Sequence, residues 1–129
     1  MRKLLILSTL IFSLMMFSST SFAEWTKVGE NVGGRTYYLD FERIRKHGGY
    51  VYWWELGDYL KPSKYGHLSG ALYKQGDCKL FRYKVLSASF HKEPMGGGTG
   101  QTENHPVKDW RYPSPHFVDE VILKLVCSR

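Results

Sequence analysis

The 23 amino-terminal residues constrain the fold most, because they determine the compartment in which the rest of the chain folds. Arg2 and Lys3 precede an apolar stretch over residues 4–17, and Ser21-Phe22-Ala23 supplies the small residues of a cleavage site. This pattern is typical of a secretory signal peptide, residues 1–23. No cysteine stands where a lipoprotein signal requires one. We therefore expect a single exported domain, residues 24–129, in the periplasm or at the cell exterior and not lipid-anchored.

The chain has two cysteines, Cys78 and Cys127. Because thiols oxidise outside the cytoplasm, a disulfide between them is the expected pairing. Closing a loop of roughly 50 residues removes denatured-state entropy worth about 4 kcal/mol in the chain-entropy model. The alternative, a reactive Cys78 thiol beside Asp77, needs a free thiol and a nearby base, and the second cysteine argues against it.

Charge and size narrow the class of protein. Without the signal peptide the chain has 106 residues (129 − 23), the size of one domain, and its formal charge falls from +6 to +4 because Arg2 and Lys3 are removed. This excess favours acidic partners such as polyanions or acidic protein patches, whereas nucleic acid is not expected outside the cytoplasm. No later apolar run reaches the roughly 18 residues of a membrane span.

Hydrophobic patterning predicts mostly strands. The strongest signal is Tyr50 to Leu60, where Tyr50, Tyr52 and Trp54 share one face and Val51 and Trp53 the other. Charged residues 40–46 are expected to form a connection and residues 75–77 a tight turn. The glycine-rich segment 91–113 is expected to be a mobile loop. Strands are predicted over residues 24–28, 35–39, 50–60, 68–74 and 78–90, the last with a bulge or strong twist.

The carboxyl-terminal segment has the pattern of an amphipathic helix over residues 115–127. Ser114 is the expected N-cap, Pro115 suits the first helical position, and Asp119 and Glu120 place negative charge in the early turns. Apolar residues recur with helical spacing and form one face. The predicted fold is α+β: an antiparallel meander of about five or six strands, one face covered by this helix, which the disulfide tethers.

No arrangement of residues typical of catalysis is found. Ser69 in Gly-His-Leu-Ser-Gly departs from nucleophile-elbow spacing, and the glycine run 96–98 is followed by neither Lys-Ser/Thr nor a helix. His91, Glu93 and His105 match no compact zinc pattern. We therefore expect no enzyme activity, no cofactor and no metal.

One candidate binding face stands out. Lys79, Arg82 and Lys84 alternate with Phe81 and Tyr83, which favours a basic, aromatic surface for a polyanion or an acidic protein patch. The competing interpretation is a solvated sheet edge whose charges guard against aggregation. Several aromatic residues could extend the face or form a homodimer contact if they are exposed. The candidate face accordingly comprises Lys79, Arg82, Lys84, Trp53 and Trp110.

The whole mature sequence resembles the surface-adhesin protein E family of Gram-negative bacteria. The resemblance rests on these features: Trp25 and Val28, Tyr37 to Asp40, Tyr52 to Trp54, Gly76-Asp77-Cys78, and the Pro113-Ser114-Pro115 helix that ends at Cys127. It implies an antiparallel sheet with a disulfide-tethered carboxyl-terminal helix. It also implies a non-enzymatic adhesin that binds host matrix or serum proteins. The alternative is a periplasmic accessory protein that binds a small ligand or a polyanion.

Overall fold

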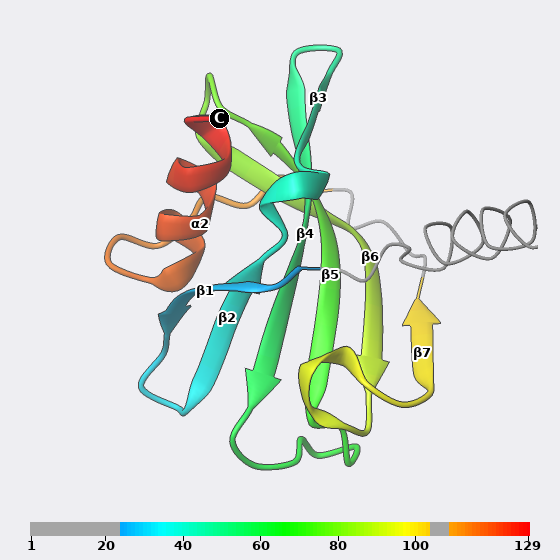
Figure 1. Cartoon of the computed structure of the whole chain (residues 1–129). Helices are drawn as coiled ribbons and strands as arrows, with labels where there is room; N and C mark the ends of the chain where they lie inside the picture. The colour runs from blue at the N-terminus through cyan, green and yellow to red at the C-terminus, as the bar shows by residue number, and fades with distance from the viewer. Residues whose placement is uncertain (1–23, 104–108) are drawn as a thin grey trace, which may run out of the picture.

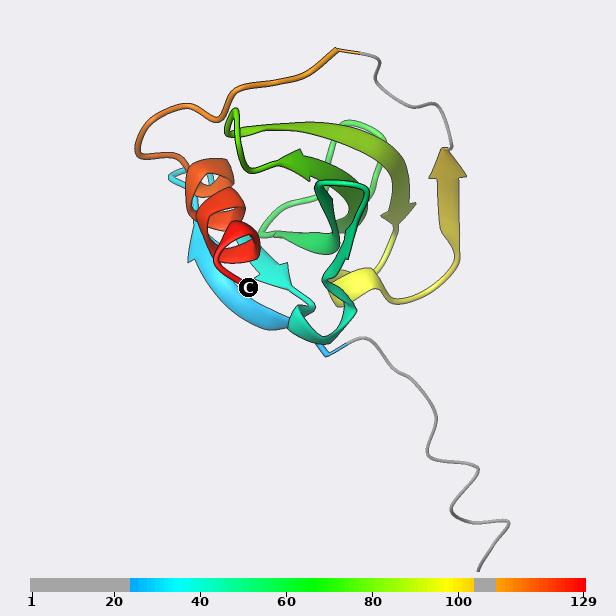
Figure 2. The same ribbon diagram turned by 90° about the horizontal axis from the view of Figure 1, so that it is seen from above.

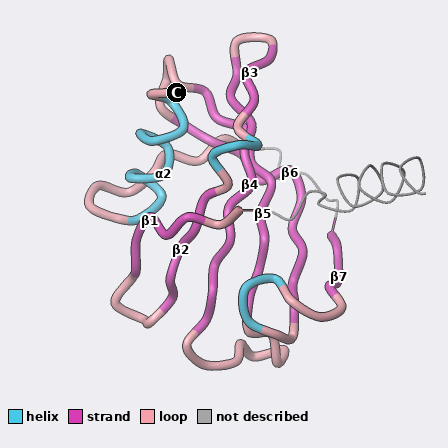
Figure 3. Tube along the Cα trace, viewed as in Figure 1, coloured by secondary structure: helices cyan, strands magenta, loops and turns pink. Residues whose placement is uncertain are grey.

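The structure is a computed structural model that describes residues 24–103 and 109–129; the predicted signal peptide and His105 lie outside them. Antiparallel strands are the main regular structure of this part of the chain (Figures 1 and 3). In order they are β1 (Thr26–Glu30), β2 (Arg35–Leu39), β3 (Arg45–His47), β4 (Tyr50–Tyr59), β5 (Ser69–Asp77), β6 (Arg82–His91) and β7 (Gly100–Glu103). Two 3-10 turns, η1 (Phe41–Arg43) and η2 (Pro94–Gly96), and one helix, α2 (Val118–Cys127), complete the fold.

The sheet has the order β1-β2-β4-β5-β6-β7, and β3 pairs with β4 outside this path. It is strongly curved, as Figure 2 shows. All pairings are antiparallel, as expected for strands joined by short turns. The predicted α+β meander with a helix on one face is therefore confirmed, with more strands than expected.

Helix α2 covers one face of the sheet, where most of the hydrophobic core lies. Its buried residues Ile122, Leu123 and Val126 pack with Leu39, Val51 and Trp53, each at most 1% exposed. Side chains alternate along a strand, so the predicted division of β4 into a Trp53 face and a Trp54 face follows directly. We call the face under α2 the helix face and the opposite one the open face.

A buried polar network stabilises the helix face. Lys74 Nζ lies 3.0 Å from Glu55 Oε1, and both side chains are less than 10% exposed. Trp53 Nε1 donates to the same carboxylate oxygen at 3.0 Å. Lys74 Nζ also lies 4.5 Å from the centroid of the Tyr83 ring, and the Tyr83 hydroxyl donates to Asp119 Oδ2 of α2 at 3.2 Å. Each buried charge thus has a partner, which the low dielectric of a core requires.

The predicted disulfide between Cys78 and Cys127 is present, with Cα atoms 5.6 Å apart. It joins the β5–β6 turn to the last residue of α2. The turn itself was placed wrongly: β5 runs through residues 75–77 and the chain reverses at residues 78–81. Gly76 lies within β5. This position needs a glycine because a Cβ there would lie 2.7 Å from Trp53 Cζ3 and 3.1 Å from Leu123 Cδ1. Asp77 closes the real turn by accepting a hydrogen bond from the Leu80 amide.

Two strands were missed in the sequence. The charged stretch Arg45–His47 forms β3, joined to β4 through Gly48 and Gly49, both with positive φ, as a two-residue hairpin requires. Within the segment expected to be a mobile loop, Gly100–Glu103 forms β7 on the edge of β6, because four register pairs hold it there. The bulge expected in the strand over residues 78–90 is present in β6. Tyr73 of β5 pairs with Ser87 and the next residue, Lys74, pairs with Val85, so Leu86 is the extra residue.

The helix begins later than expected. Its N-cap residue is Phe117, and not Ser114 as predicted. Asp119 and Glu120 lie in the first turn, as expected. The segment before the helix passes outside the β5–β6 hairpin (Figure 2). Arg111 and Tyr83 exchange backbone hydrogen bonds of 2.8 and 2.9 Å there. This bridge fixes the position of the neighbouring Trp110.

Candidate functional site

The open face presents aromatic and basic side chains along its length. Alternation and register place the side chains of one set of residues there: Tyr50, Tyr52 and Trp54 of β4, Tyr73 and Gln75 of β5, and Arg82 and Lys84 of β6. All seven are half-buried, and no helix of the described chain covers them. This face is therefore available to a partner.

At one end, three of the predicted residues form a compact cluster, which we call the basic aromatic patch (Arg82, Lys84, Trp110 and Tyr50). The Arg82 guanidinium carbon and Lys84 Nζ each lie 4.4 Å from the centroid of the Trp110 ring. The Tyr50 and Trp110 ring centroids are 5.6 Å apart. Cations over an indole face are attracted by its quadrupole, so the ring holds both charges at the surface.

The electrostatics of the patch leave one cation free to pair with a partner. Arg82 Nε lies 3.0 Å from Asp77 Oδ2. Burial opposes ionisation of Asp77, but hydrogen bonds from the Leu80 amide and from Arg82 outweigh it and lower its pKa below the usual value. Asp77 is therefore ionised and neutralises Arg82. Among the described residues no carboxylate lies within 4 Å of Lys84 Nζ.

A row of aromatic rings continues from the patch across the open face. The Tyr73 ring lies between those of Tyr52 and Trp54, with centroid distances of 6.2 and 5.0 Å. The Arg43 guanidinium lies 5.7 Å from the ring centroids of both Trp54 and Trp25, and Asp40 holds it through a 2.6 Å contact. The row of rings thus has cations at both ends, Arg82 and Lys84 on β6 and Arg43 beside Trp25.

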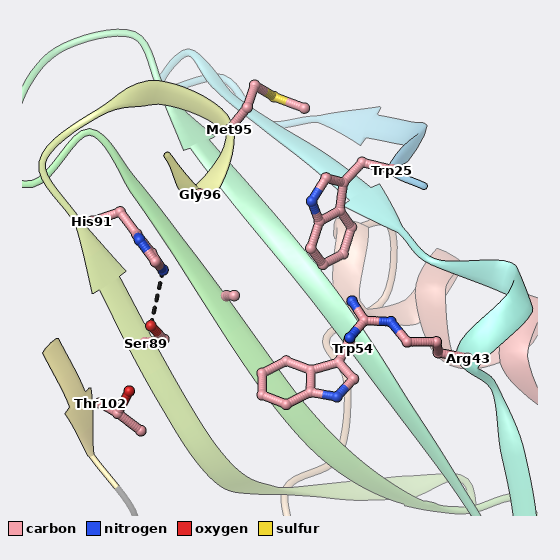
Figure 4. Close-up of a pocket in the computed structure, with 9 residues that line it drawn as sticks. Trp25, Arg43, Trp54, Ser89, His91, Met95, Gly96 and Thr102 are labelled. Atoms are coloured by element: carbon pink, nitrogen blue, oxygen red, sulfur yellow. Dashed lines mark hydrogen bonds between the residues drawn. The ribbon is translucent and has the colours of Figure 1, made fainter. Parts of the chain in front are cut away.

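The row ends in a shallow trough of about 320 Å³ beside η2. Figure 4 shows Trp25, Trp54 and Arg43 on one side of it and His91, Ser89 and Thr102 on the other. Ser89 Oγ and His91 Nε2 are 2.8 Å apart, while His91 Nδ1 is buried without a hydrogen-bond partner among the described residues. The trough can therefore accept a small polar group between the indole rings on one side and the His91 imidazole on the other.

The remaining predicted site residues lie elsewhere. Lys79 is exposed in the β5–β6 turn, and no contact joins it to Trp110. Trp53 is 1% exposed beneath α2 and so is removed from the candidate face. Its indole N–H is already bonded to Glu55. The reason is that β4 alternates, and the helix covers the face on which Trp53 lies.

Ser69, considered in the sequence as a nucleophile, has a structural role. Ser69 is fully buried, donating to the Glu93 carbonyl at 2.7 Å and accepting from the Gly96 amide at 2.9 Å, so it anchors η2. Within residues 24–103 and 109–129 no three His, Cys, Asp or Glu side chains converge on a metal position. In the same residues no helix has the length and apolarity needed to cross a membrane.

Trp25 and Tyr73 belong to the open face but were not selected from the sequence. Tyr73 could have been found, since it lies opposite Trp54 in the β4–β5 register. Trp25 directly precedes β1, and it contacts Arg43 of η1. The two residues are far apart in the sequence, so no local pattern predicts this contact.

Comparison with known proteins identifies the family. A family model described as surface-adhesin protein E matches residues 25–128. Two solved structures of Haemophilus influenzae protein E share 18% identity with this chain, with TM-scores of 0.63 and 0.62. Each covers 85% of this chain, which in turn covers 91% and 88% of theirs. At this identity the likeness shows the fold.

A structure of protein E from non-typeable Haemophilus influenzae gives the same result, with 18% identity, a TM-score of 0.58, and coverage of 85% of this chain and 79% of that one. A search of curated proteins finds no match. Because the family model spans nearly all of the described domain, and the folds agree, the chain belongs to the surface-adhesin protein E family.

Proposed function

We propose that this is an exported, non-enzymatic binding protein that attaches through its open face to an acidic surface of a host matrix or serum protein. The observation that carries the proposal is the row of rings and cations that begins at the basic aromatic patch. Aromatic and arginine side chains are the residues that dominate interface energetics. Lys84 has no carboxylate partner within the described chain, so it supplies the charge that an acidic partner complements.

Membership of the adhesin family supports the same proposal. The signal-peptide pattern of residues 1–23 would deliver the protein across the inner membrane, where the Cys78–Cys127 disulfide is stable. The open face resembles a protein-binding surface more than a catalytic one because it is broad, half-exposed and lined by rings.

The test is binding of the purified protein to a panel of extracellular matrix and serum proteins. Arg82→Ala combined with Lys84→Ala should weaken binding by at least about tenfold, the loss of one or two charge-assisted contacts. Lys46→Ala combined with Lys124→Ala is the matched control, because it removes the same net charge from exposed sites on β3's edge and α2. If both pairs weaken binding equally, the patch is not a specific site.

A second candidate function, a periplasmic accessory protein for a small ligand or polyanion, is favoured by the trough beside η2. Cell fractionation separates the two. Protein found on the surface of intact cells would support the adhesin function. Protein confined to the periplasmic extract would exclude the adhesin function and leave the periplasmic one. Retention on heparin that depends on Arg82 and Lys84, without binding to any protein of the panel, would identify a polyanion as the partner.

A further inference from the structure

A second hollow lies on the helix face, beyond the part of the sheet that α2 covers. Its volume is about 820 Å³, within the usual range of small-molecule sites. The β2–β4 register shows how far it lies from the core. Leu39, in the core under α2, pairs with Glu55, whereas Arg35, which lines the hollow, pairs with Tyr59 at the other end of β4. We call this hollow the groove. Its lining residues are Arg35, Ser63, Tyr59, Tyr65, His67, Phe90, Lys92, Gln101 and Glu103.

Glycine residues allow side chains to lie flat on the floor of the groove. A Cβ at Gly70 would be 2.7 Å from the Tyr59 hydroxyl and 3.2 Å from Phe90 Cδ1. A Cβ at Gly57 would be 3.3 Å from Arg35 Cδ. The Arg35 guanidinium accordingly rests 4.3 Å from the Tyr59 ring centroid. The floor is therefore a pre-formed platform of a ring and a cation.

The loop between β4 and β5 forms the wall. Backbone hydrogen bonds from Ser63 to His67 (2.8 Å) and from Gly66 to Ser63 (2.9 Å) close it, and the Ser63 hydroxyl also accepts from the His67 amide. This turn holds Tyr65 at 74% exposure. The His67 ring lies between those of Tyr65 and Phe90, with centroid distances of 6.5 and 5.6 Å. An exposed ring on a rigid turn is available to a ligand at little entropic cost.

Charge decides which ligand fits. The groove is lined by two cations, Arg35 and Lys92, and one acid, Glu103. In the part of the chain that the structure describes, neither cation lies within 4 Å of a carboxylate. Lys61 and Lys64 of the same loop are exposed and add positive charge. The groove thus combines stacked rings, hydrogen-bonding groups from Gln101, Ser63 and Glu103, and unpaired cations.

We propose that the groove binds an acidic saccharide, a pyranose that carries a carboxylate. The apolar C–H face of a sugar ring packs on aromatic rings such as Tyr65 and Phe90. Its hydroxyl groups pair with the amide, hydroxyl and carboxylate of the rim, and its carboxylate pairs with Arg35 and Lys92. This site is separate from the open face and does not depend on the function proposed for that face.

The experiment compares two tetrasaccharides of equal length by calorimetry or NMR titration of the purified protein. A hyaluronan tetrasaccharide carries glucuronate, and fully N-acetylated chitotetraose is its neutral counterpart. We expect at least about tenfold tighter binding of the acidic one, the effect of one charge-assisted contact. Tyr65→Ala should weaken both by about tenfold. Arg35→Gln combined with Lys92→Gln should remove the preference for the acidic sugar while weak binding of both remains.

Controls separate this proposal from that for the open face. Arg82→Ala with Lys84→Ala should leave saccharide binding unchanged, and Tyr65→Ala should leave binding to a protein partner unchanged. Since Tyr65, Arg35 and Lys92 are exposed, their substitution should not alter the thermal unfolding midpoint by more than a few degrees. Equal affinity of the unsubstituted protein for the two tetrasaccharides would overturn the proposal. So would equally tight binding of a polyglutamate peptide, which would show an anion site without sugar recognition.

Discussion

Trp53 and Trp54 are neighbours in β4, yet they have opposite environments. Trp53 is 1% exposed under α2, bonded to a buried carboxylate and packed against Leu123 and Val126. Trp54 is half-buried on the open face, between the Tyr73 ring and the Arg43 guanidinium. The helix face therefore stabilises the fold, and the open face holds a similar set of aromatic residues where a partner can reach them. We therefore expect substitutions on the open face to cost less stability than substitutions on the helix face.

The largest effect should come from the covalent link that holds α2 to the helix face. Cys78→Ser combined with Cys127→Ser releases a loop spanning a sequence separation of 49. We expect the free energy of unfolding to fall by about 4 kcal/mol, measured by urea denaturation. The unsubstituted protein in reductant should lose a similar amount. An unchanged free energy in both experiments would mean that the helix face needs no tether.

Gly76 tests how closely α2 is packed on the sheet. The Cβ of Gly76→Ala would lie 2.7 Å from Trp53 Cζ3 and 2.9 Å from Val51 Cγ1, so β5 or the core must move. We expect a cost of about 3 kcal/mol, the upper end for overpacking. Gly29→Ala is the matched control, because its Cβ would be in ordinary contact, 3.4 Å from Val118 Cγ1. Equal losses from the two substitutions would show that packing at Gly76 is not tight.

A smaller effect should appear at alkaline pH. Burial, followed by the nearby carboxylate of Asp119, raises the pKa of Tyr83 to about 12. Since the unfolded phenol ionises near pH 10, stability should be fully present below about pH 10 and fall as the pH rises, by about 2 kcal/mol at about pH 11.5. Tyr83→Phe should flatten this decline in denaturation experiments, leaving the contribution of Tyr59, whose pKa burial also raises. An identical pH profile in the variant would argue against a buried Tyr83.

Much of the helix face could be predicted from the sequence because its signals are local. Alternation in β4 separates Trp53 from Trp54, helical spacing marks Ile122 and Val126, and the exported context pairs the two cysteines. The secondary-structure predictions were wrong where tertiary contacts, and not local sequence, determine the conformation. Gly76 indicates a turn by its type, but Trp53 and Leu123 require it within a strand. Arg45–His47 has no apolar residue, and only pairing with β4 makes it a strand.

The candidate site was less predictable because its members come from distant parts of the chain. The spacing of Arg82 and Lys84 in the sequence places both on one face of β6. Trp110, which contacts both, is held there by the backbone bridge between Arg111 and Tyr83, and the sequence does not predict that bridge. The groove depends on the Ser63–His67 turn and on Phe90 across the sheet. The position of Trp53 was inferable in principle, since the predicted helix had to cover one of the two β4 faces.

The most direct test of the division between the faces is the unfolding free energy of two single variants, Trp53→Ala and Trp54→Ala. Both remove an indole from adjacent positions of one strand. The account predicts that Trp53→Ala lowers the free energy of unfolding several times more than Trp54→Ala, because only Trp53→Ala leaves a cavity beneath α2 and removes a hydrogen bond to the buried Glu55 carboxylate, which then keeps only Lys74. Equal losses would contradict it, since the two faces would then contribute alike to stability.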